Sequence, residues 1–204
     1  MITQIDHIIL SVAQERLTEL SDRLKQAGFV HGDAGQHPSG TANENLAFKG
    51  GAFIELLYEQ SPGSGPAVWF RETPRIQGVG FSTTDYEGDI AAWISLSTAW
   101  NRPFHKMLED GRQMTSQAAG PLPMEEFYVF CMDREGPPFS TLGGTAKLES
   151  ITFAGSEAAL WHSRFRDWFG LKERKNSLLC GDVELRFEEG PHPRIRASLP
   201  VSYT

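Results

Sequence analysis

The chain has 204 residues, of which 40% are hydrophobic and 22% are charged, so it can bury a sizeable core and is too polar for a bundle of membrane helices. Its 26 acidic residues outnumber the 19 basic ones, giving a formal net charge of -7 without a sharp cluster of basic residues. An acidic surface of this kind repels a phosphate backbone, and we therefore expect no nucleic acid as a partner.

Cysteine usage and the N-terminal segment indicate the compartment. Cys131 and Cys180 form no CxxC or CxxxC pair, which is typical of a reducing environment. The first residues lack the pattern of a signal peptide, and no apolar run reaches the roughly 18 residues that span a bilayer. We therefore expect a cytoplasmic protein without a membrane partner.

The first module is expected over residues 1–60 and begins with a strand and a helix. A short apolar, β-branched run at residues 5–12 predicts the strand. In residues 14–27 leucines recur at helical spacing among charged residues, and Gly28 stands where a helix C-cap belongs. Three more strands are predicted at residues 29–32, 41–48 and 52–59.

A second, more divergent module is expected over residues 75–141. Residues 60–74 precede it and are rich in proline and glycine, which is typical of a linker, although they contain the aromatic pair Trp69 and Phe70. The module is predicted to hold a strand at residues 78–83, a helix that opens at 85–89, and strands at 112–116 and 127–132.

A partial third repeat is expected over residues 146–188. Residues 148–153 align with residues 5–10, and a helix at residues 156–169 is predicted to end at Gly170. Glu184 then lies between Val183 and Leu185, as Glu55 lies between Ile54 and Leu56. The third repeat is shorter than the first by about one strand and its turn. Its pattern is therefore βαββ, and the three starts indicate a βαβββ unit that was duplicated and extended within one pseudo-symmetric body.

Three segments of the chain carry a recognisable combination of residues. They are Asp6-His7-Ile8, residues 35–43 with the sequence GQHPSGTAN, and Phe53-Ile54-Glu55-Leu56-Leu57. Together they resemble the glyoxalase-like domain of the vicinal oxygen chelate superfamily, best over residues 1–60 and more weakly over 75–100 and 146–188. The resemblance implies an α+β fold of paired βαβββ modules, in which curled antiparallel and mixed sheets form a cup with helices outside.

The resemblance also implies a divalent metal held in the cup by His7 and Glu55. Imidazole and carboxylate groups suit Zn, Mn, Ni, Fe or Mg, with positions left open for a substrate. A complete site needs donors from a second module, but the positions that match His7 are Gly78 and Ser150. Glu184, which aligns with Glu55, is the candidate third ligand or catalytic base.

Substrate-binding residues are expected at the mouth of the cup. The resemblance places His37, Thr41 and Asn43 there, and Trp69 is a candidate for an aromatic wall together with Phe70, Trp93 and Phe127. No GxGxxG, GxxxxGK[ST] or GxSxG motif occurs, so no nucleotide cofactor is expected.

Structural alternatives exist for each of these residues. His7 can cap the sheet through backbone hydrogen bonds, and Glu55 can pair with a cation or face outward. Glu184 precedes Arg186 closely enough for a surface ion pair, and the residues around His37 can form a hydrogen-bonded turn.

Two functions therefore remain open. The first is a metal-dependent lyase or isomerase acting on a small vicinal-oxygen substrate, of the α-oxo or hemithioacetal type. The second is a metal-free protein of the same fold that binds and sequesters a small molecule. A homodimer is compatible with both.

Overall fold

The computed structural model describes residues 2–65, 69–70, 74–93, 99–120, 128–134 and 138–203. Its first eight strands are β1 (Ile2–Ser11), β2 (Val30–Gln36), β3 (Thr41–Ala47), β4 (Phe53–Glu59), β5 (Arg75–Thr83), β6 (Trp100–Leu108), β7 (Gln113–Gly120) and β8 (Tyr128–Met132). The remaining elements are β9 (Ser150–Ala154), β10 (Lys172–Arg174), β11 (Ser177–Cys180), β12 (Val183–Glu188), β13 (Arg194–Ala197), η1 (Gln14–Arg16), α1 (Leu17–Gln26), α2 (Tyr86–Trp93) and α3 (Ala158–Phe169).

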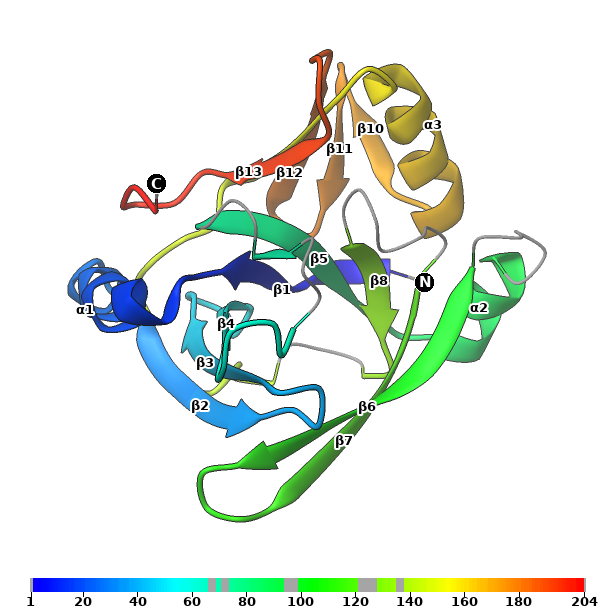
Figure 1. Cartoon of the computed structure of the whole chain (residues 1–204). Helices are drawn as coiled ribbons and strands as arrows, with labels where there is room; N and C mark the ends of the chain where they lie inside the picture. Colours follow the sequence, from blue (N-terminus) through cyan, green and yellow to red (C-terminus); the bar gives the residue numbers. More distant parts are fainter. Residues whose placement is uncertain are drawn as a thin grey trace.

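The first eight strands curl into a cup. They pair in the order β1-β4-β3-β2-β6-β7-β8-β5, and an antiparallel pairing of β1 with β5 closes the ring. Within each half the first and last strands along the chain lie side by side and run parallel, β1 beside β4 and β5 beside β8. Helices α1, α2 and α3 lie outside the strands (Figure 1). The predicted α+β cup of curled, mixed sheets is therefore confirmed.

Strand β1 separates the main core from the interior of the cup. Because side chains alternate along a strand, Ile8 and Leu10 pack into the main hydrophobic core, whereas Ile9 belongs to a smaller cluster with Trp69 and Phe130. His7 shares the face of Ile9. A strand that is buried on both faces has a nearly continuous apolar sequence, and the sequence of β1 follows this pattern.

The third unit extends the sheet beyond the cup. Strand β13 pairs with β5 through Ile195 and Ile76, and with β9 along its length, so it joins the two parts. The unit contains a short β10 where the sequence predicted a lost strand, and β13 lies in a tail for which no strand was predicted. Helix α3 ends at Gly170, whose φ of 61° is the left-handed conformation of the predicted C-cap.

The sequence did not predict β6. Charged residues and Pro103 interrupt its apolar pattern, and proline is unusual inside a strand. Pairing with β7 from Trp100 to Met107, and with β2 at Met107 and Leu108, fixes it in the sheet nonetheless. Three residues assigned to predicted elements, Ile94, Ser97 and Phe127, lie outside the described residues. Within the described part of the chain, no helix is long and apolar enough to cross a membrane.

Candidate functional site

The cup encloses a cavity of about 520 Å³, a size that suits a small organic ligand. Side chains from β1, β2, β3, β4, β6, β7 and β8 line it. Strand β5 contributes glycine instead: a Cβ on Gly80 would lie 2.8 Å from Cε1 of His7. Gly80 therefore leaves the space that the His7 ring occupies. It is also the residue paired with His7 across the antiparallel strands.

A buried carboxylate orients His7. Asp6 is fully buried, and its Oδ1 lies 2.6 Å from Nδ1 of His7. Arg134 donates to both oxygens of Asp6, and the Ser82 hydroxyl donates to Oδ2. Burial opposes ionisation of Asp6, but the hydrogen bonds and charges of His7 and Arg134 outweigh it and lower the pKa to about 2. Because an ionised Asp6 can only accept, Nδ1 of His7 carries the proton and Nε2 is left to face the cavity.

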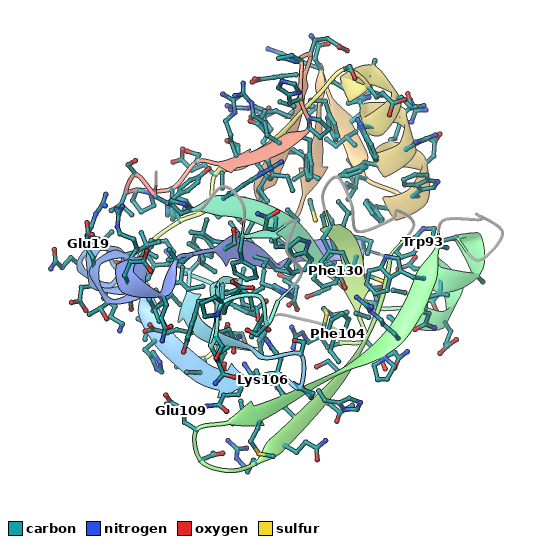
Figure 2. The ribbon with its side chains drawn as sticks, viewed as in Figure 1. Glu19, Trp93, Phe104, Lys106, Glu109 and Phe130 are labelled. Atoms are coloured by element: carbon teal, nitrogen blue, oxygen red, sulfur yellow. The ribbon has the colours of Figure 1, made fainter. Side chains whose placement is uncertain are left out.

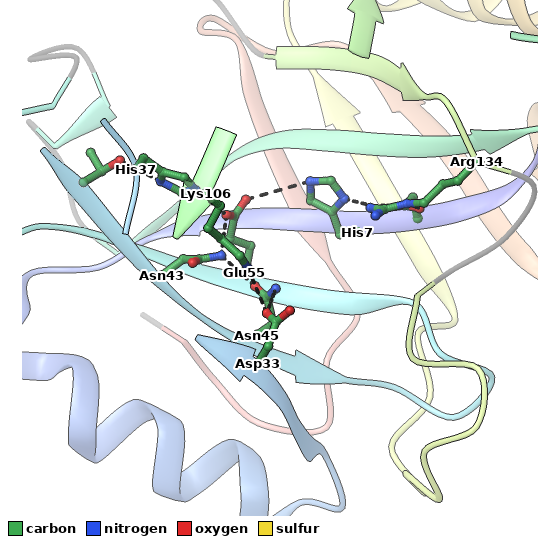
Figure 3. Close-up of polar contacts among 10 residues, drawn as sticks. His7, Asp33, His37, Asn43, Asn45, Glu55, Lys106 and Arg134 are labelled. Carbon is green, nitrogen blue, oxygen red and sulfur yellow. Dashed lines mark hydrogen bonds and ion pairs between the residues drawn. The ribbon is translucent and has the colours of Figure 1, made fainter. Parts of the chain in front are cut away.

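Glu55 lies between two histidines. Its Oε2 is 3.8 Å from Nε2 of His7, and its Oε1 is 3.8 Å from Nε2 of His37. Asn43 donates through Nδ2 to Oε1 at 2.7 Å. Figure 3 shows His7 and His37 on opposite sides of the carboxylate. The three predicted residues His7, His37 and Glu55 therefore come together in the cavity, as do Asn43 and Thr41.

His37 lies in the turn between β2 and β3. Its Nδ1 lies 2.9 Å from the Thr41 hydroxyl, within the turn that precedes the strand. Burial lowers the pKa of His37, and the charge of Lys106 lowers it further, against an opposing effect of Glu55. The neutral imidazole that results can accept or donate one hydrogen bond through Nε2.

A buried ion pair lies next to these residues. Lys106 is 5% exposed, and its Nζ donates to Oδ1 of Asp33 at 2.8 Å. Asn45 donates to the same oxygen at 2.6 Å and accepts from Asn43, which links the pair to Glu55 (Figure 3). Neither residue was predicted from the sequence: Lys106 lies in the unpredicted β6, and Asp33 lies just beyond the strand predicted at residues 29–32.

Aromatic side chains form another part of the cavity lining. The Tyr128 ring stacks on Phe130 at 4.4 Å and approaches Trp69 at 5.6 Å. Phe104 adds a fourth ring, and Figure 2 shows it close to Phe130 in the middle of the molecule. Trp93, a predicted wall residue, instead packs in the main core, with Phe169 5.3 Å away.

Glu184 is not among the residues that line the cavity. It accepts hydrogen bonds from Ser177 and Arg186, which lower its pKa. Glu184 pairs with Ser150, whereas Glu55 pairs with Ile9, two residues beyond His7. The alignments of Ser150 with His7 and of Glu184 with Glu55 are therefore out of register with each other by two residues. The ion pair of Glu184 with Arg186 is the alternative that the sequence left open.

Comparison with known proteins agrees with this geometry. Residues 5–169 match the family described as a glyoxalase-like domain. The chain belongs to this family. No curated protein matches the glyoxalase-like chain.

Solved structures show the same fold. A hypothetical protein from Staphylococcus aureus superposes on the glyoxalase-like chain with a TM-score of 0.70 and 14% identity, over 95% of this chain and 91% of that one. A mutant of 4-hydroxymandelate synthase from Streptomyces coelicolor gives 0.56 and 14%, over 94% and 63%. The Mn(II)-bound glyoxalase from Novosphingobium aromaticivorans gives 0.53 and 12%, over 95% and 64%. The synthase and the glyoxalase are members of the vicinal oxygen chelate superfamily, and the similarity to all three structures shows the fold.

The donor set of this glyoxalase-like domain does not fit the metal site that the resemblance implies. His7 and His37 flank Glu55 instead of converging with it, and no group of three or more His, Cys, Asp or Glu among the described residues is arranged to hold a metal ion. In the second half, Gly80 on β5 lies opposite His7, and its partner on β8 is Phe130. Neither carries an imidazole or a carboxylate.

Proposed function

We propose that this glyoxalase-like chain is a lyase or isomerase that moves a proton on a small, oxygen-bearing substrate of the α-oxo type held in the cup. One observation carries the proposal. Nε2 of His7 faces the Glu55 carboxylate across 3.8 Å within the cavity, while Nδ1 is fixed by Asp6. Two groups that accept and return protons are thus positioned beside one ligand space.

The chemistry needs only a proton transfer. Nε2 of His7 takes a proton from a carbon next to a substrate carbonyl, and the bonding electrons move into an enolate. The imidazolium that forms is stabilised by Asp6, which stays ionised because its pKa is lowered to about 2. The proton then returns to a different atom of the substrate, either from Nε2 of His7 directly or from Glu55 after His7 has passed the proton to that carboxylate, so that no oxidant or reductant is consumed.

Two neighbouring groups support this reaction. Asn43 holds the Glu55 carboxylate at 2.7 Å, which limits its rotation. Lys106 lines the same cavity and supplies a positive charge that favours an enolate oxygen. Because the donors do not fit a metal site, the proposed step uses none. A small-molecule substrate is the expected partner, and the cytoplasmic setting is supported by two buried, free cysteines.

The aromatic side chains favour a second candidate, binding of a small molecule without turnover. Trp69, Tyr128 and Phe130 belong to a hydrophobic cluster separate from the main core. Such a wall stabilises a flat apolar ligand whether or not a reaction follows.

Deuterium exchange distinguishes the two candidates. The protein is incubated in D₂O with a panel of α-oxo acids, α-hydroxy acids and hemithioacetals, and proton NMR follows loss of the signal at the carbon next to the carbonyl or hydroxyl. We expect exchange that falls at least 100-fold in His7→Gln and Glu55→Gln. The exposed His192, which is not among the cavity-lining residues, provides the control His192→Gln. Equal exchange in His7→Gln and the unmodified protein would exclude the proposed role of His7, and binding without exchange would favour the second candidate.

A further inference from the structure

Arg134 is joined to the proton-transfer groups by hydrogen bonds and also lines the cavity. Its Nε and Nη2 donate to the two oxygens of Asp6, the buried carboxylate that orients His7. Lys106, another basic residue of the lining, is 5% exposed and donates to Asp33. The side chain of Arg134 is 22% exposed, so part of it remains accessible to a ligand.

A second donor edge of the Arg134 guanidinium is left for that ligand. A guanidinium presents one fork of N–H groups at Nε and Nη2 and another at Nη1 and Nη2. Asp6 occupies the first fork. Nη1 has no hydrogen-bond partner among the residues that the structure describes. The second fork can therefore donate to both oxygens of a carboxylate, the geometry that makes arginine a strong and specific ligand for this group.

Asp6 holds the guanidinium in place. Nε of Arg134 donates to Oδ2 of Asp6 at 2.6 Å, and the Ser82 hydroxyl donates to the same oxygen at 3.0 Å. Asp6 itself is fully buried. A side chain that is already fixed loses little conformational entropy when it binds a second carboxylate. The second fork is thus preorganised before a ligand enters the cup.

The position of Arg134 relative to His7 suits an α-oxo acid. Arg134 and Glu55 lie on opposite sides of the His7 ring (Figure 3). Oδ1 of Asp6 is 2.6 Å from Nδ1 of His7, so this one carboxylate separates the guanidinium from the imidazole. In an α-oxo acid, only the carbonyl carbon separates the carboxylate from the carbon that loses its proton. A carboxylate bound by Arg134 therefore directs that carbon along the His7 ring toward Nε2.

Apolar rings around His7 strengthen a charged contact at this position. Phe53 stacks on the imidazole at 4.7 Å, and Phe130 meets it edge-on at 5.2 Å. Both line the cavity together with Met132. Such walls exclude water and lower the local dielectric constant, which strengthens the attraction between a guanidinium and a carboxylate. A neutral carbonyl compound gains no such attraction.

We propose that the substrate is an α-oxo acid whose free carboxylate is bound by Nη1 and Nη2 of Arg134. Arg134 is then the residue that selects an acid over a neutral carbonyl compound of the same size. The assignment rests on the proposed function for its reacting groups, and it narrows the substrate class.

Pairs of an acid and its amide test the assignment. Pyruvate and pyruvamide have the same size and the same carbonyl, but only pyruvate is charged; 4-methyl-2-oxopentanoate and its amide form a second pair with a longer apolar chain. Binding is measured by calorimetry, and proton NMR in D₂O follows exchange at the carbon next to the carbonyl. We expect each acid to bind about 10-fold or more tightly than its amide, as for a hydrogen bond to a charged group.

Three variants locate the source of this preference. In Arg134→Gln the acid and the amide should bind equally, whereas a purely structural role of Arg134 would weaken both and leave the ratio of their affinities unchanged. Arg134→Lys keeps a cation beside Asp6 and so protects folding, but an ammonium group has no planar fork, and the ratio should fall part of the way. Arg112→Gln, at an exposed position outside the cavity lining, is the matched control and should keep the full ratio.

Several results would overturn the assignment. They are absence of binding for both acids in the millimolar range, equal binding of acids and amides by the unmodified protein, or an undiminished preference for acids in the Arg134 variants. Failure of the proposed function gives a different pattern. If the acids bind through Arg134 but exchange no proton, the carboxylate site stands and proton transfer fails. If the amides exchange a proton as fast as the acids, proton transfer stands and the assignment fails.

Discussion

Replacement of Asp6 by asparagine tests the arrangement around His7 most directly. Asp6 is fully buried and accepts hydrogen bonds from His7, Ser82 and Arg134. Its pKa is about 2 in the folded protein and 3.8 in the reference state. This difference corresponds to about 2 kcal/mol of folding free energy. Removing the charge also leaves Arg134 without its carboxylate, which raises the expected loss at pH 7 to about 3 kcal/mol.

The pH dependence of this loss follows from the sign of the pKa shift. A carboxylate whose pKa is depressed on folding stabilises the folded state fully above the unfolded pKa, and the stabilisation is lost as the pH falls toward the folded pKa. The advantage of the unmodified protein over Asp6→Asn should therefore be constant from pH 7 to about 5 and shrink between about 4 and 2.

Urea unfolding at a series of pH values measures this difference. Asp110 forms an exposed pair with Arg112, and Asp110→Asn is the control, for which we expect no measurable change in stability because exposed ion pairs contribute little. A loss in Asp6→Asn that stays constant down to pH 2 would show that the ionised carboxylate is not the source of the stability. The reasoning about His7 would then be wrong, since the protonation of Nδ1 depends on that charge.

Three further changes test particular contacts by urea unfolding. Gly80→Ala places a Cβ 2.8 Å from the His7 ring. It should lower the free energy of unfolding by about 1 to 3 kcal/mol and remove most of the proton-exchange activity. Retained activity would contradict the described packing. Gly170→Ala meets no atom within 4 Å but keeps a φ of 61°, so it should cost about 1 kcal/mol without affecting activity; an unchanged stability would argue against the left-handed cap. Lys106→Met leaves Asp33 without its 2.8 Å ion pair and should lower the free energy of unfolding by about 1 to 3 kcal/mol. If the loss of the ion pair is the cause, this loss of stability should vanish in the double variant with Asp33→Asn.

The parts of the site that the sequence predicted are those that local pattern determines. His7 and Glu55 are polar residues inside apolar strands, and alternation along a strand is enough to place such residues on a definite face. His37, Thr41 and Asn43 also lie in the segment that carried the family resemblance. The structure brings all five residues to the cavity lining.

The missed residues depend on pairings between distant parts of the chain. Arg134 reaches Asp6 across 128 positions, and nothing in either local sequence indicates the other. Lys106 lies in a strand that contains a proline, so tertiary pairing overrides its local pattern. The third repeat shows a related limit. Glu184 was matched to Glu55 from the neighbouring residues alone, and these do not reveal that the register of β9 with β12 differs by two residues from that of β1 with β4.

The position of β1 in the ring has a consequence for the order of folding. This strand pairs with β4 on one side and β5 on the other, and neither partner follows it directly in the chain. Closing such long loops costs entropy before the contacts form, which slows folding. During synthesis on the ribosome, β1 cannot form its sheet pairings until β4 and β5 have been made. Asp6 cannot form its ion pair until Arg134 has been made, which is later still. The histidine near the N-terminus is therefore oriented only after about two thirds of the chain has been made, so no shorter nascent fragment carries a competent site.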